Sequence, residues 1–241
     1  MPYKPDQILI SKTPEDLFQD VARNICHYAK DSVKQNGRFN MALAGGSTPK
    51  QLYITLSSPP YLNEIPWQHC HFYFGDERMV PHDHQDSNYL MAKSALFDRA
   101  PIPEDNIHPI PTNCTDNNAC AAQYAHDISE LDHFDLVLLG MGDDGHTASL
   151  FPQTAILQEH EKSTAAVFVE KMNSWRISLT YPTLNKARRV LVLIKGEDKQ
   201  DMVKNVLYGQ DTSNYPVTGV QPSGELIWQL DRAAHPDIIK T

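Results

Sequence analysis

Four times along the chain, a short apolar run stops at a loop rich in glycine and in polar or charged residues. The runs and their loops are "MALA" before "GGSTP", "HFYF" before "GDER", "DLVLL" before "GMGDDGH" and "VLVLI" before "KGEDK". Continuous apolar runs of this length are typical of strands buried on both faces of a parallel sheet. Ligands of open α/β sheets bind outside the carboxyl ends of the strands. The pattern therefore predicts that the four loops meet at one crevice.

Helical segments alternate with these runs. Thr13 is expected to cap a helix that begins at Pro14 and stops at Gly37, and Thr48 is expected to cap a second helix, with Gln51 completing a capping box. Further helices are expected over 88–97, 115–131 and 197–208, and strands over 167–170, 176–180 and from 225 into a short helix. The alternation predicts an α/β fold, with a mostly parallel sheet and helices on both faces, in a single domain over residues 1–241.

Composition narrows the class of protein. The chain has 241 residues and a net charge of −9, which disfavours nucleic acid as a partner. No secretory signal or membrane-length apolar run is visible, so we expect neither secretion nor a membrane partner. The four cysteines show no metal spacing and no dense disulfide framework, which favours a reducing, cytoplasmic location.

The first loop suits an anion. Gly45, Gly46, Ser47 and Thr48 offer backbone N–H groups, two hydroxyls and a helix N-terminus, a combination that binds phosphate well. A tight turn with an ordinary helix cap explains the same residues, and the loop matches neither the dinucleotide fingerprint nor a Walker loop.

The second and third loops carry groups suited to acid–base chemistry. His146 follows Asp144 by two residues, and an imidazole beside a carboxylate is suited to proton transfer near neutral pH. Arg78 can clamp a phosphate or a developing oxyanion, and Asp76 can orient water or a sugar hydroxyl. The alternatives are a histidine that caps the next helix and a solvated cluster of charges.

Histidines and cysteines elsewhere invite a metal or a thiol interpretation. His69 and His71 are expected on one face of a strand, and His82 and His84 in a loop, with no tetrahedral ligand spacing. Cys70 precedes His71 directly, but adjacent residues of a strand point to opposite faces, which disfavours a thiol nucleophile. We therefore predict no metal site.

Five segments in series resemble a known family. They are "LAGGSTPKQLY", "FGDERMVPHDHQDSNY", "LVLLGMGDDGHTASLFP", "RISLTYPTLNKARRVLVLIKGEDK" and "ELIWQLDRAA", and they span residues 40–234. They look like the family of 6-phosphogluconolactonases and glucosamine-6-phosphate deaminases. The resemblance implies a three-layer, Rossmann-like α/β fold. It also implies hydrolysis of 6-phospho-D-glucono-1,5-lactone to 6-phosphogluconate in the oxidative pentose phosphate pathway, without a metal or an organic cofactor.

The resemblance also implies roles for individual residues. His146 would be the general base that activates water, assisted by Asp144, while Asp76 and Arg78 would face the reacting end of the sugar. The phosphate would be held by Arg176, Lys199 and the loop 45–48. The oligomeric state is left open between a monomer and a weak dimer.

Two rival functions follow from the same resemblance. The related deaminases usually carry Asn-Glu-Pro after the histidine and Glu-Tyr after the aspartate, whereas this chain has "LFP" and "ER" there, which favours the lactonase. A non-catalytic sugar-phosphate sensor would need a DNA-binding region, for which the chain has little room before Asn40 and the wrong charge.

Overall fold

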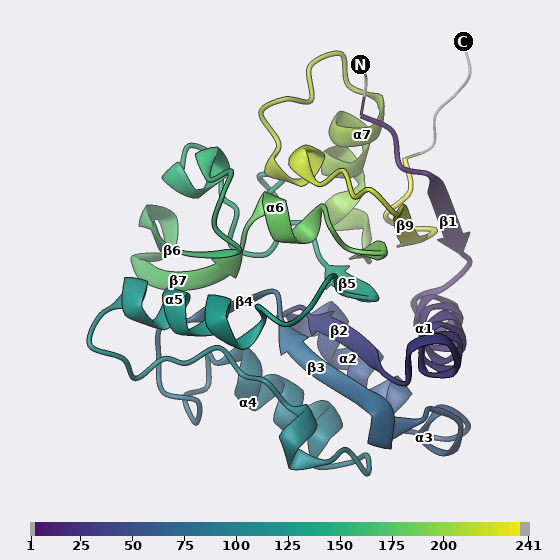
Figure 1. Ribbon diagram of the computed structural model, residues 1–241. Coiled ribbons are helices and arrows are strands. Elements are labelled where there is room, and N and C mark those ends of the chain that lie inside the picture. Colours follow the sequence, from purple (N-terminus) through teal and green to yellow (C-terminus); the bar gives the residue numbers. More distant parts are fainter. Residues whose placement is uncertain (1–2, 237–241) are drawn as a thin grey trace.

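Six parallel strands form the centre of the computed structural model, which describes residues 3–236 (Figure 1). They are β1 (Gln7–Ser11), β2 (Phe39–Leu43), β3 (Cys70–Phe74), β5 (Leu136–Leu139), β8 (Arg189–Ile194) and β9 (Glu225–Asp231). Their order in the sheet is β1-β9-β8-β5-β2-β3, and every neighbouring pair is parallel. The four strands predicted to share a crevice are thus adjacent and point the same way.

The chain reverses its direction across the sheet between β2 and β5. From β2 it moves outward to β3, whereas from β5 it moves the opposite way through β8 to β9. Parallel crossovers are right-handed, so this reversal places α1 (Pro14–Asn36) and α2 (Ser47–Leu56) on one face, and α5 (Asn117–Asp127) and α7 (Gln200–Tyr208) on the other. The contacts of α1 with α2, β2 and β9 agree with this placement. The expected three-layer α/β fold is confirmed. Its topological switch point lies between the adjacent strands β2 and β5.

The first two helices begin in different ways. Thr13 caps α1 by accepting a hydrogen bond from the N–H of Asp16, and Gly37 ends the helix with φ 77°, both as predicted. The capping box at Thr48 was wrong, because the N-cap of α2 is Gly46, two residues earlier, and it makes no side-chain bond to the helix. With a φ of 104°, Gly46 turns the chain tightly enough to place Ser47 and Thr48 in the first helical turn.

A second, antiparallel sheet was not expected. It consists of β4 (Asp76–Arg78), β7 (Ser174–Leu179) and β6 (Thr164–Val169), in that order. Figure 1 shows β6 and β7 beside the main sheet with α5 against them, in agreement with their contacts. Edge strand β1 was also missed, and residues 232–234 form a turn instead of the short helix expected after β9.

Shorter elements complete the chain. These are α3 (Tyr61–Glu64), α4 (Asn88–Ala92) with a π-helical turn at Lys93–Phe97, α6 (Tyr181–Leu184) and 3₁₀ turns at Trp67–His69, Glu104–Asn106, Ala155–Gln158, Glu170–Met172, Glu197–Lys199 and Pro216–Gly219. No helix within residues 3–236 is long and apolar enough to span a bilayer.

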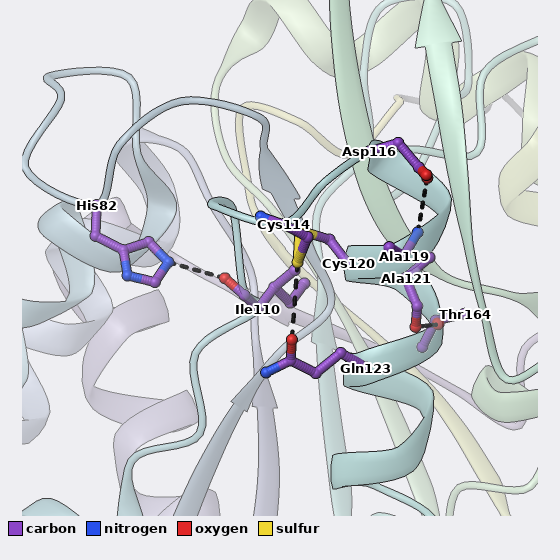
Figure 2. The surroundings of a disulfide bond; sticks show 9 residues. All are labelled: His82, Ile110, Cys114, Asp116, Ala119, Cys120, Ala121, Gln123 and Thr164. Atoms are coloured by element: carbon purple, nitrogen blue, oxygen red, sulfur yellow. Dashed lines mark hydrogen bonds between the residues drawn. A yellow bond between two sulfur atoms is a disulfide. The ribbon is translucent and has the colours of Figure 1, made fainter.

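The cysteines form one pair. Cys114 and Cys120 are joined by a disulfide at the start of α5, where Asp116 caps the helix through the N–H of Ala119 (Figure 2). This bond was not predicted from the sequence, because a single pair six residues apart carries no framework signature. Cys26 and Cys70 are free and buried.

Candidate active site

A cleft of about 270 Å³ lies at the carboxyl ends of β2, β3, β5 and β8. All four loops predicted to meet contribute side chains or backbone to its wall. Of the residues singled out in the sequence, those that line the cleft are Gly45, Gly46, Ser47, Thr48, Asp76, Arg78, His146, Arg176 and Lys199. Asp144 stands directly behind His146.

The imidazole of His146 is held by Asp144. Nδ1 of His146 lies 2.5 Å from Oδ1 of Asp144, and the same oxygen accepts the backbone N–H of His146 at 3.2 Å. The second carboxylate oxygen lies 3.3 Å from Nζ of Lys171. Burial alone would raise the pKa of Asp144, but the hydrogen bonds and charge of His146 outweigh it, so the pKa of this carboxyl is lowered. Asp144 therefore stays ionised near neutral pH and keeps the proton of the imidazole on Nδ1.

The other ring nitrogen, Nε2 of His146, makes no hydrogen bond to any described residue, and the side chain lines the cleft. The ring can take this place because the backbone at Gly142 passes close beside it. A Cβ on Gly142 would lie 2.0 Å from the imidazole, and the N–H of Gly142 donates to the carbonyl of His146 at 2.8 Å. Any larger residue at 142 would displace the ring.

The small sheet sets the charged wall of the cleft. In the antiparallel pair of β4 and β7, Arg78 lies directly opposite Arg176, and Asp76 lies opposite Ser178. Residues two apart share a strand face, so these four side chains lie on one side of the ladder. Like charges in direct opposition destabilise a sheet. Two facing arginines at a cleft therefore indicate a site for an anion.

Arg176 is the most enclosed of these cations. It is 6% exposed, its Nη1 lies 3.8 Å from Oδ2 of Asp76, and its Nε is buried without a partner. Burial lowers the pKa of Arg176 while Asp76 raises it. An unsatisfied N–H in a buried guanidinium is costly unless a ligand accepts from it.

The two acidic residues of "GDER" accept hydrogen bonds from several neighbours. Oδ2 of Asp76 accepts from Oγ of Ser149 at 2.6 Å, and Nδ2 of Asn88 donates to Oδ1 at 3.2 Å. Glu77 is 1% exposed and accepts from four donors, among them the backbone N–H groups of Arg78 and Asn88. Burial raises the pKa of Glu77, and these hydrogen bonds oppose the rise. The roles of Glu77, Asn88 and Ser149 were not predicted from the sequence, because hydrogen bonds between separate loops leave no local pattern.

Another part of the wall is the start of α2. The first N–H groups of a helix have no intrahelical partner, and the hydroxyls of Ser47 and Thr48 bond to no described residue. Lys199 reaches the same cleft, where its ammonium contacts Asp143 and lies 3.9 Å from Asp198. Lys195, not anticipated from sequence, also lines the cleft. This wall can hold a phosphate.

The remaining candidates lie elsewhere. His69 precedes β3 in a 3₁₀ turn, so the expected shared strand face with His71 was wrong. His71 instead bonds to His108 at 3.2 Å, and His82 bonds to the carbonyl of Ile110 (Figure 2). Across residues 3–236, no three His, Cys, Asp or Glu side chains are grouped to hold a metal ion. Burial raises the pKa of Cys70 to about 12, which makes its thiol unreactive.

Comparison with known proteins gives a consistent result. Residues 12–228 match the family model described as glucosamine-6-phosphate isomerases/6-phosphogluconolactonase. The chain is 42% identical over 218 residues to a 6-phosphogluconolactonase of Nostoc sp., covering 86% of this chain and 88% of that relative. It superposes on the 6-phosphogluconolactonase of Trypanosoma cruzi with a TM-score of 0.86 at 30% identity, covering 97% of each chain. A monomeric glucosamine-6-phosphate deaminase shares the fold, with a TM-score of 0.83 at 21% identity over 95% of this chain and 98% of the other.

Proposed function

This chain belongs to the family of glucosamine-6-phosphate isomerases and 6-phosphogluconolactonases, and we propose on that premise that it hydrolyses 6-phospho-D-glucono-1,5-lactone to 6-phosphogluconate. The observation that carries the proposal is the cleft itself, because the imidazole held by Asp144 shares its lining with two arginines and two lysines. We take residues 1–241 as one catalytic domain, supported by the family match over 12–228.

Water activation is the part assigned to His146. Nε2 accepts a proton from water as the water oxygen bonds to the lactone carbonyl carbon. General-base help of this kind contributes about 10²- to 10⁴-fold. The ring C–O bond then breaks, and the departing oxygen takes the proton back from His146. Asp144 stabilises the imidazolium that exists between these two steps.

The cations divide between two charges of the substrate. Arg78 is assigned to the oxyanion that develops on the carbonyl oxygen, because such a charge needs a donor already fixed in place. Nη1 of Arg78 is fixed by the carbonyl of Asp86 at 2.6 Å. Arg176, Lys199 and the first turn of α2 are assigned to the phosphate, whose binding energy then positions the ring.

The deaminase is the nearest rival. The notable position is 151, where the segment after His146 carries a phenylalanine instead of an acid, and its ring packs against the imidazole. Phe151 offers no carboxylate to move protons for ring opening. This observation and the identity to named lactonases favour the lactonase.

The test is a pair of assays on the intact chain. Hydrolysis of the phosphorylated lactone, corrected for spontaneous opening, should give 6-phosphogluconate, whereas glucosamine 6-phosphate should release no ammonia. D-glucono-1,5-lactone, which lacks the phosphate, should have a kcat/KM lower by about 100-fold or more. Ammonia release, or no hydrolysis above background, would overturn the proposal.

The finer statements on surroundings are proposals too. A sugar-phosphate lactone is the partner that the site suits, and a cytoplasmic location fits the bacterial 6-phosphogluconolactonases to which the chain is similar.

A further inference from the structure

A phenylalanine outside the cleft contacts two of the groups that line it. Phe151 is 3% exposed, and its ring is stacked on the imidazole of His146 with centroids 3.9 Å apart and planes at 19°. The guanidinium carbon of Arg176 lies over the same ring, 5.6 Å from its centroid. Phe151 lines the neighbouring cavity together with Asp144 and does not line the cleft. It therefore acts on the substrate only through other residues.

The backbone around Phe151 is fixed at both ends. On the side of His146, Leu150 donates its N–H to the carbonyl of Thr147 at 2.9 Å across a turn in which Ala148 has a φ of 46°. On the other side, the carbonyl of Phe151 accepts the hydroxyl of Thr154 at 2.6 Å. A left-handed conformation at a non-glycine residue persists only where its surroundings enforce it. The ring is thus held by its backbone as well as by its packing.

The same turn is joined to the strand that carries Arg176. The N–H of Ser149 donates to Oγ of Ser178 at 3.2 Å, and Ser178 lies two residues after Arg176 on β7. Residues two apart share a face of the strand. The turn that follows His146 and the strand that carries Arg176 are therefore connected at two points, through Ser178 and through the ring of Phe151.

The face of an aromatic ring attracts cations. Both neighbours of Phe151 are cations during the reaction. Arg176 is charged throughout, and His146 becomes charged once it accepts the proton of water. The stack also fixes the plane of the imidazole, while Asp144 fixes which nitrogen is free. Packing alone would fix the plane but would not favour the charged form.

We propose that Phe151 is a positioning residue that sets the imidazole of His146 against the guanidinium of Arg176 and stabilises the imidazolium formed during lactone hydrolysis. The inference rests on the proposed function for its kinetic consequences. Its effect on the orientation of the imidazole of His146 is independent of any substrate.

The test replaces the aromatic ring of Phe151 by an apolar side chain that has no ring. In Phe151→Leu, kcat/KM for the phosphorylated lactone should fall by about 10- to 100-fold, the loss expected when a catalytic group is misplaced by up to about 1 Å. The acid limb of its pH profile should move to lower pH, because the imidazolium loses the ring face. Phe151→Tyr keeps the ring and should retain most of the activity.

Phe168→Leu is the matched control, because Phe168 is a half-exposed ring that stacks on Trp175 and lies outside the cleft. It should leave kcat/KM and the pH profile unchanged. A Phe151→Leu protein that is folded and matches this control in both readouts would overturn the proposal. If Phe151→Leu does not fold, Phe151→Met removes the ring with a more adaptable side chain and is judged by the same two readouts.

An NMR spectrum of His146 recorded without substrate separates this proposal from the proposed function. In Phe151→Leu the ring-proton resonances of His146 should move, because the ring current of the stacked phenylalanine is lost. Unchanged resonances contradict the inference, even in a chain with full lactonase activity. Moved resonances support it, even in a chain without that activity.

Discussion

At the scale of single residues, the pair of Asp144 and His146 decides which nitrogen of the imidazole is available. One oxygen of Asp144, Oδ1, lies 2.5 Å from Nδ1 of His146 and also accepts the backbone N–H of His146. Because the pKa of Asp144 is lowered, the carboxylate remains charged throughout the range in which a histidine titrates. Asp144 itself should therefore not titrate on the acid limb of the activity profile near neutral pH.

Asp144→Asn should lower kcat by about 10²- to 10⁴-fold, because an amide does not fix the tautomer or stabilise the imidazolium. Lys171→Met is the matched control. It removes the cation from the second oxygen of Asp144, but the Lys171 side chain is 62% exposed, so solvent screens its charge and kcat should change by less than about 3-fold. Steady-state rates of the two variants check this. Equal losses in both would show that the contact with His146 is not what matters.

At the scale of elements, two buried tyrosines brace the strand ends from which the site loops leave. The hydroxyl of Tyr53 accepts the N–H of Ala44 at 2.9 Å and donates to its carbonyl at 2.8 Å. The hydroxyl of Tyr124 does the same for Phe74, at 2.8 and 2.9 Å. Each strand end thus has its backbone groups satisfied by a helix from a different face of the sheet.

Tyr124→Phe should reduce the free energy of unfolding by about 1–3 kcal/mol, because it leaves a buried N–H and a buried carbonyl without partners. Tyr89→Phe serves as the control, since the hydroxyl of Tyr89 bonds to no described protein group and its loss should cost less than about 0.5 kcal/mol. Urea unfolding of both variants measures the difference. Equal midpoints would mean that the hydroxyl of Tyr124 is not needed to satisfy the strand end.

Elements with a periodic or continuous apolar pattern could be predicted from the sequence, and so could the convergence of their loops. The long helix at Pro14–Asn36 and the four buried strands carry such patterns. Strand β4 is three residues long and carries no recognisable period, and its pairing with β7 depends on contacts far apart in the chain. Residues that support the site, such as Asn88 and Phe151, also act through contacts between separate segments of the chain. Their roles could therefore not be predicted from the sequence.

At the scale of the whole molecule, stability should depend on pH through a pair of partly buried histidines, His71 on the edge strand β3 and His108 in the loop beside it. Burial and the neighbouring His71 lower the pKa of His108 to about 4. The unfolded chain therefore binds a proton at this position between pH 6.5 and 4 that the folded chain does not bind. Stability conferred by neutral His108 is complete above pH 6.5 and is lost as the pH falls toward 4.

Between pH 6.5 and 4, the free energy of unfolding of His108→Phe should fall by about 1 kcal/mol less than that of the wild type. The figure is small because the imidazole is only half buried. Phenylalanine can keep the stacking on Tyr73, where the ring centroids are 4.3 Å apart. His133→Gln alters an exposed histidine and should leave the slope unchanged. Thermal unfolding as a function of pH gives both slopes. A His108→Phe slope equal to that of the wild type would rule out this pair as a source of the acid sensitivity.

The rate of lactone hydrolysis by His146→Gln tests most directly whether the imidazole in the cleft acts on a phosphorylated lactone. Glutamine keeps a polar side chain of similar reach but has no basic nitrogen. With the spontaneous reaction subtracted, we predict a kcat about 10²- to 10⁴-fold below the wild type with little change in KM, because the phosphate site is intact. A folded His146→Gln protein that hydrolyses the lactone at the rate of the wild type would contradict the account.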